Sequence, residues 1–155
     1  MNNRLALGTV QFGLPYGIAN HRGQVSREDA KGIIALARLS GIDTIDTAIG
    51  YGESEGCLGD VGLDGFKVIT KLPAMPDNVA DVGVWVHDQM QSSLQRLNVP
   101  TVYGLLLHRS QQLLSPKGEA LAQAIGQLKS EGVVQKIGVS IYAPSELDRL
   151  MNVCQ

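Results

Sequence analysis

Four polar residues that lie far apart along the chain have side chains that together could transfer a proton: Asp46, Tyr51, Lys71 and His108. A tyrosine phenol is a poor proton donor at neutral pH because its usual pKa is about 10, and a nearby ammonium group lowers that pKa. Lys71 would supply the ammonium group, Asp46 would hold it in place, and His108 would orient a substrate oxygen. We therefore interpret the four residues as a general acid system that acts on a carbonyl group.

Reduction of a carbonyl group by these residues would also require a nicotinamide cofactor, because no side chain supplies a hydride. Each residue alone has a simpler interpretation, such as a turn cap, a surface ring or a solvated lysine, so the hypothesis depends on their joint occurrence. An aldolase in which Lys71 forms a Schiff base is a second catalytic hypothesis. The nearby Tyr51 and Asp46 favour the reductase.

Strand and helix patterns alternate five times along the chain with short connections. The predicted strands are residues 5–10, 42–46, 66–70, 101–107 and 136–140. The predicted helices are residues 26–40, 55–61, 79–97 and 117–131, and a last helix that begins at Ser145. Strict alternation of this kind indicates a parallel α/β sheet with helical crossovers.

The candidate site residues stand at or beyond the predicted strand ends, and Tyr51 lies in a loop between two glycines, Gly50 and Gly52. In a (β/α)8 barrel the carboxyl ends of all strands meet on one face, so we expect these residues to converge. An open dinucleotide-binding sheet would instead need Gly-x-Gly-x-x-Gly after its first strand. Residues 8–13 lack the middle glycine, which favours the barrel.

Composition and charge narrow the classes of function. The chain has 155 residues, expected to form one domain over 1–155, and its net charge of −2 gives no reason to expect nucleic acid or an anionic membrane as a partner. No apolar run is long enough to span a bilayer, and the N-terminus does not resemble a signal peptide. Cys57 and Cys154 form no disulfide framework, and the three histidines have no metal-ligand spacing. A cytoplasmic protein without a metal site is the expectation.

The segment after Tyr51 has a structural interpretation. Ser54 can cap the helix that follows, and Glu53 and Glu55 fit its first turn, where negative charge is favourable. We therefore do not assign the two glutamates to the predicted site.

Five motifs taken together resemble the aldo-keto reductase family. The most specific is Asp-Thr-Ala-Ile-Gly-Tyr-Gly-Glu-Ser-Glu at residues 46–55, and the others are residues 8–13, 70–71, 105–108 and 136–140. The resemblance implies a (β/α)8 barrel that uses NADPH, or less often NADH, to reduce small aldehydes and ketones. It also implies roles for four residues: Tyr51 as proton donor, Lys71 and Asp46 as its activating pair, and His108 as the residue that orients the carbonyl group.

The resemblance further places the cofactor near Gly8, Thr9, Asp46 and Ser140. Many family members have asparagine after the serine of the fifth strand, where its side chain helps to hold the nicotinamide carboxamide. This chain has Ile141 at that position, so this contact is not expected.

The chain contains only the first five strand–helix units of such a barrel. Five strands leave the first and fifth as open edges, which invite pairing with another chain. We therefore expect a truncated form of a longer reductase, an assembly with a second copy or a complementary fragment, or a flatter rearranged sheet. The isolated chain is expected to turn over weakly or not at all. A non-catalytic nucleotide-binding or assembly module on the same scaffold is the alternative function.

Overall fold

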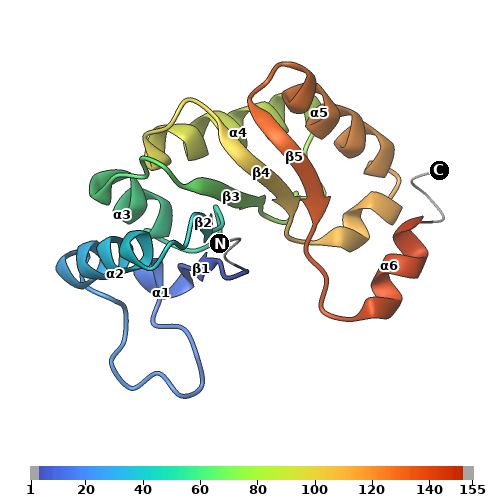
Figure 1. The fold of residues 1–155 in the computed structure, drawn as a ribbon. Coiled ribbons are helices and arrows are strands. Elements are labelled where there is room, and N and C mark those ends of the chain that lie inside the picture. The colour runs from blue at the N-terminus through green and yellow to red at the C-terminus, as the bar shows by residue number, and fades with distance from the viewer. Residues whose placement is uncertain (1–3, 152–155) are drawn as a thin grey trace.

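The computed structural model describes residues 4–151, and its strands and helices alternate as predicted (Figure 1). The strands are β1 Leu7–Gly8, β2 Thr44–Asp46, β3 Lys67–Leu72, β4 Val102–Leu107 and β5 Val134–Val139. The helices are α1 Val10–Gly13, α2 Arg27–Leu39, α3 Ser54–Val61, α4 Val82–Leu97, the 3-10 helix η1 Ser110–Leu114, α5 Gly118–Ser130 and α6 Pro144–Met151.

The strands form one parallel sheet in the order β1-β2-β3-β4-β5, which confirms the predicted parallel topology. Helices α2, α3, α4 and α5 lie along one side of this sheet (Figure 1). The strand order follows the chain order because each helical crossover returns the chain to the next position in the sheet. β1 and β5 are consequently the two edges of the sheet.

One face of the sheet carries the predicted site. Paired residues on neighbouring strands point to the same face, and so do residues two apart along one strand. Asp46 pairs with Ile69, Ile69 pairs with Gly104, and Lys71 pairs with Leu106. Asp46 and Lys71 therefore lie on the same face, which we call the inner face.

The opposite, outer face carries the hydrophobic core. Its strand residues form one buried cluster with apolar residues from α2, α3, α4 and α5. Fully buried members are Ile45, Leu72 and Leu105 from the strands and Ile34, Leu58, Met90, Leu97 and Leu121 from the helices. Burial of this apolar area is the main term that holds the helices on the sheet.

Helices α2 and α4 each begin directly after a residue whose side chain caps the helix N-terminus. The Asp29 N–H donates to Ser26 Oγ at 3.1 Å, and Ser26 Oγ donates to the Asp29 carboxylate at 2.7 Å, as the capping spacing before α2 predicts. α4 begins later than predicted because Asp81 caps it by accepting the Val84 N–H at 3.0 Å.

The first strand is shorter than the predicted 5–10. β1 covers only Leu7–Gly8, and the short helix α1 follows at once. Thr9 makes this change of direction, because its N–H donates to the Asp46 carbonyl at 3.0 Å while its own carbonyl accepts the Phe12 N–H at 2.9 Å. The first of these bonds belongs to the sheet and the second to a helical turn.

The third strand is longer than the predicted 66–70. Lys71 was expected just beyond the strand end, but it lies within β3 and pairs with Leu106 of β4. The strand pairing therefore fixes the backbone of Lys71 directly.

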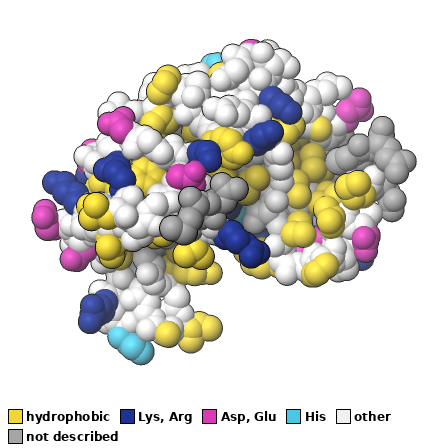
Figure 2. Space-filling view, in the orientation of Figure 1, with side chains coloured by type: hydrophobic (Ala, Val, Ile, Leu, Met, Phe, Trp, Pro, Cys, Tyr) yellow, Lys and Arg dark blue, Asp and Glu magenta, His cyan; other side chains and the backbone are white. Residues whose placement is uncertain are grey.

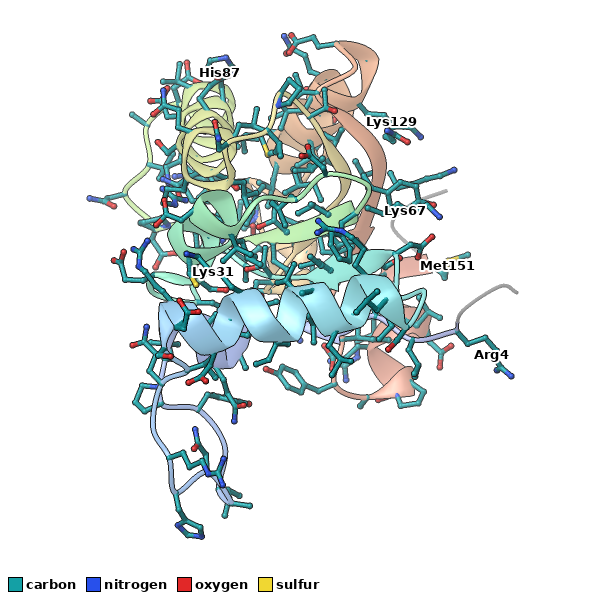
Figure 3. The ribbon with its side chains drawn as sticks, turned by 60° about the vertical axis from the view of Figure 1, so that its left-hand side comes forward. Arg4, Lys31, Lys67, His87, Lys129 and Met151 are labelled. Carbon is teal, nitrogen blue, oxygen red and sulfur yellow. The ribbon has the colours of Figure 1, made fainter. Side chains whose placement is uncertain are left out.

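The segment between α1 and α2 projects from the body of the molecule, as two views show (Figures 1 and 3). At the other end of the chain, α6 begins at Pro144, one residue before the predicted start at Ser145. The continuation of the predicted helix beyond Met151, and Cys154, lie outside the described residues.

Candidate active site

All four residues of the predicted proton-transfer site meet on the inner face. Lys71 Nζ lies 2.5 Å from Asp46 Oδ1 and 3.5 Å from the Tyr51 hydroxyl oxygen. The Tyr51 and His108 rings meet edge to face, with centroids 5.7 Å apart and planes at 79°. β2, β3, the loop after β2 and the residue after β4 each contribute one member, so the convergence predicted from parallel strand ends is present.

Lys71 is the most buried member of the set, with a side chain only 6% exposed. A buried ammonium group is costly unless it is paired and hydrogen-bonded. Lys71 Nζ meets this need by donating to the Asp46 carboxylate and, at 2.8 Å, to the Thr47 carbonyl. The same nitrogen lies 5.0 Å from the centroid of the Tyr51 ring, so the positive charge is held beside the phenol.

Tyr51 is held by a backbone contact that leaves no room for a side chain. A Cβ atom at Gly13 would lie 1.7 Å from the Tyr51 carbonyl oxygen and 2.4 Å from the Ser54 nitrogen. Gly52 has φ +55, and a Cβ there would lie 2.5 Å from the Gly13 carbonyl oxygen. Gly50, by contrast, has open space around it, so Gly13 and Gly52 are the glycines that this loop requires.

His108 is half-buried and follows β4, where its N–H donates to the Leu72 carbonyl at 3.1 Å. Burial lowers the pKa of its imidazole below the usual value, and the positive charges of Lys71 and Arg109 lower it further. His108 is therefore neutral at neutral pH and presents one N–H donor. A neutral imidazole of this kind can donate a hydrogen bond to a carbonyl oxygen near Tyr51.

The lowered pKa of His108 predicts a specific loss of stability in acid. Above the ordinary pKa of 6.5 the imidazole is neutral in both the folded and the unfolded state. Below this pH the unfolded chain takes up the proton first, so the free energy of unfolding decreases as the pH is lowered. Between about pH 7 and about pH 5 the parent should lose more stability in urea unfolding than His108→Gln, in which the other histidines are unchanged. Equal losses would contradict this prediction.

A second group of side chains supports the site from the outer face of the sheet, and the sequence did not predict this supporting role. Thr9, Thr47 and Ser54 are completely buried. Ser54 Oγ lies 3.1 Å from Thr47 Oγ1 and 2.9 Å from the Thr9 carbonyl, and Thr9 Oγ1 donates to the Asp46 carbonyl at 3.0 Å. Ser54 makes no side-chain cap on α3, where it is the first residue. The three hydroxyl groups instead join β1, β2 and α3 beneath the site.

The residues that the resemblance assigns to the cofactor lie at the ends of the two edge strands, β1 and β5, and at the end of β2. Gly8 is exposed at the end of β1, with no atom within 4 Å of the position a Cβ would take. Ser140 follows β5, half-buried, and its N–H donates to the Leu107 carbonyl at 2.9 Å. Thr9 differs from these two, because its side chain is buried and directed towards Asp46.

Residues 4–151 contain neither a candidate metal site nor a candidate membrane-spanning helix. No group of three or more His, Cys, Asp or Glu side chains in this range could hold a metal ion. None of the helices in this range is both long enough and apolar enough to cross a membrane.

Comparisons with known proteins agree with the arrangement of strands and helices. The chain belongs to the aldo/keto reductase family, whose sequence model matches residues 4–154. It is 32% identical to the aflatoxin B1 aldehyde reductase member 2 of Rattus norvegicus over 96% of this chain. That match covers 40% of the rat protein, so the chain spans less than half the length of this relative.

Solved structures of the family share the fold. A putative aldo-keto reductase from Pseudomonas aeruginosa superposes with a TM-score of 0.76 at 26% identity, over 95% of this chain and 59% of the other. The holo form of the aldo-keto reductase AKR11C1 from Bacillus halodurans gives 0.72 at 19% identity, over 96% and 49%, which supports the fold alone. The five units described above are thus part of a TIM-type (β/α)8 barrel.

Proposed function

We propose that this chain carries the proton-transfer site of an NAD(P)H-dependent oxidoreductase that reduces an aldehyde or a ketone to an alcohol. The observation that carries the proposal is the position of Lys71 Nζ, which contacts both the Asp46 carboxylate at 2.5 Å and the Tyr51 hydroxyl at 3.5 Å. A buried ammonium group in this position favours the ionised phenol that remains after proton donation. Tyr51 is therefore the proton donor.

The other residues of the site have complementary tasks. NADPH, or NADH, supplies the hydride when it is bound. Tyr51 gives its hydroxyl proton to the substrate oxygen, Lys71 stabilises the resulting phenolate, and Asp46 keeps Lys71 in place. His108, neutral at neutral pH, donates a hydrogen bond to the same substrate oxygen and orients the carbonyl group.

The cofactor is assigned to the inner face, between the end of β1 and the end of β5. Gly8 and Ser140 are the exposed candidates for its contacts, and the empty space around Gly8 suits the approach of a flat ring. Thr9 and Asp46 complete the expected set, Thr9 by holding the Asp46 backbone and Asp46 by its partly exposed carboxylate. The substrate is a small carbonyl compound, and the rat relative, named as an aldehyde reductase, makes aldehydes the first class to test.

The test is the rate of NADPH oxidation with a simple aldehyde. The isolated chain should react weakly, and Tyr51→Phe should lower that rate by about 10²–10⁴-fold, because the proton donor is lost. Tyr103→Phe, on β4, is the matched control and should react like the parent. Equal rates for the parent and Tyr51→Phe would refute Tyr51 as the donor.

A second candidate function, an assembly module or non-catalytic nucleotide-binding module, is favoured by exposed apolar residues on β5, on α6 and in the loop between them. Only Val134 of β5 is buried, and Ile137, Tyr142 and Leu147 are 44%, 85% and 46% exposed. Hydrophobic side chains gather over these elements in the space-filling view (Figure 2). An unpaired strand edge with apolar side chains invites pairing with another chain, including a second copy.

Sedimentation velocity tests this second candidate. The parent should form dimers or larger species as its concentration rises, and Ile137→Lys should shift the distribution towards monomer, because charge on an edge strand opposes pairing. Val84→Lys, an exposed apolar position on α4, is the control and should sediment like the parent. NADPH binding without turnover, together with a defined oligomer, would favour the module over the enzyme.

A further inference from the structure

Glu55 is a completely buried carboxylate that the proposed reaction does not use. It is 1% exposed, and it lies in the first turn of α3. Thr70 Oγ1 and Ser93 Oγ each donate to its Oε1 atom at 2.7 Å. Arg96 donates to its Oε2 atom from Nε at 2.9 Å and from Nη2 at 2.7 Å. All four donors are thus gathered on one carboxylate.

The partners of Glu55 connect it to the strand that carries Lys71. Thr70 is the residue before Lys71 on β3, and its side chain lies on the outer face while Lys71 points to the inner face. Glu55 itself follows the loop that holds Tyr51. The bond from Thr70 to Glu55 therefore joins the segment of the phenol to the strand of the ammonium group, from the side of the sheet opposite to the reaction.

Helix α4 is the third element that contacts Glu55. Ser93 and Arg96 lie three residues apart on one face of α4, and both reach the same carboxylate. A Cβ atom at Gly59 of α3 would lie 2.1 Å from the Arg96 carbonyl oxygen, so the two helices touch backbone to backbone. Ser93 and Arg96 hold Glu55 to α4, whereas Thr70 alone joins it to β3.

We propose that Glu55 is a positioning residue, which sets the distance between the Tyr51 phenol and the Lys71 ammonium group by holding α3 against β3 through Thr70. The inference rests on the proposed function of Tyr51 and Lys71. Their 3.5 Å contact lies at the outer limit of a hydrogen bond, so a small shift of the Tyr51 loop breaks it. A shift of about 1 Å in such a group can cost about a hundredfold in rate.

Two substitutions that each remove one hydrogen bond from the same oxygen atom test the proposal. Thr70→Val removes the link to β3, and Ser93→Ala removes a link to α4 that Arg96 still maintains. Both hydroxyl groups are completely buried and donate to Glu55 Oε1 at 2.7 Å, so the two variants are closely matched. Thermal unfolding should show a similar loss of stability in both.

The readout is the proton NMR signal of the His108 ring, which lies beside the Tyr51 ring and is shifted by its ring current. Comparison with His21→Asn and His87→Asn, both at exposed positions, assigns the His108 signal. Thr70→Val should move the His108 signal, while Ser93→Ala should leave it in place. The rate of NADPH oxidation should fall about tenfold to a hundredfold in Thr70→Val and remain near that of the parent in Ser93→Ala.

Thr70→Ser keeps the hydroxyl group and provides a check if Thr70→Val does not fold. A parent-like His108 signal in Thr70→Ser supports the proposal, and a displaced signal in this variant overturns it. Unchanged signals in both Thr70→Val and Ser93→Ala, or equal shifts in both, also overturn it. If the signal moves as expected but Tyr51→Phe oxidises NADPH at the rate of the parent, the positioning of Tyr51 stands and the proposed reaction fails.

Discussion

Replacement of Arg96 with methionine should lower the free energy of unfolding by about 3 kcal/mol, because it leaves the buried Glu55 carboxylate without its counter-charge. Glu55 is 1% exposed, whereas the Arg96 side chain is 38% exposed and partly screened by water. The expected loss therefore lies at the lower end of the range for breaking a buried ion pair. Methionine keeps an unbranched apolar stem against α3, so lost packing contributes little. Urea unfolding followed by circular dichroism measures the change.

A second substitution distinguishes the loss of charge pairing from the loss of packing, because the two explanations predict opposite changes in the free energy of unfolding. Glu55→Gln in the Arg96→Met chain removes the unpaired charge but keeps an oxygen that accepts from Thr70 and Ser93. This double variant should therefore be more stable than Arg96→Met alone, although Glu55→Gln in the parent should be destabilising. A double variant that is less stable than either single variant would contradict the explanation.

Substitution of Gly13 with alanine should cost about 3 kcal/mol of stability, near the upper end for overpacking. The new methyl group would lie 1.7 Å from the Tyr51 carbonyl oxygen and 2.4 Å from the Ser54 nitrogen. Both contacts are with backbone atoms, which cannot move aside as the end of a flexible side chain can. α1 and the Tyr51 loop must therefore separate, and NADPH oxidation should fall together with stability.

Gly32→Ala on α2 is the matched control for this prediction. A Cβ atom at Gly32 meets no atom within 4 Å, so the same substitution should stabilise the chain by about 0.4–1 kcal/mol through its effects on helix propensity and on the unfolded state. Opposite signs at the two glycines in urea unfolding are the expected result. A Gly13→Ala chain as stable as the parent would show that the Tyr51 loop can move to accommodate the methyl group, and the explanation of how Tyr51 is held would be wrong.

The alternation of strands and helices and the gathering of Asp46, Lys71 and His108 could be predicted from sequence, because both depend on local patterns. Runs of β-branched and apolar residues mark the strands, and parallel strands must bring their carboxyl ends to one face. Strand boundaries were less accurate. Lys71 lies inside β3 because its pairing with Leu106 extends the strand, and no local signal around residues 66–72 reports a partner on β4.

The supports of the site could not be read from local patterns. Glu55 matches the first turn of a helix, yet its charge is buried against residues up to 41 positions away. No local pattern distinguishes Gly13 from the other glycines, because its role depends on the contact between α1 and the Tyr51 loop. Ser54 matches a helix cap in sequence, but its hydroxyl donates a hydrogen bond to the carbonyl of Thr9, 45 positions away. Side-chain type and spacing along the chain are enough to identify groups that can do chemistry at strand ends. The residues that hold those groups in register depend on which distant surfaces come into contact, and that follows from packing of the whole sheet and its helices.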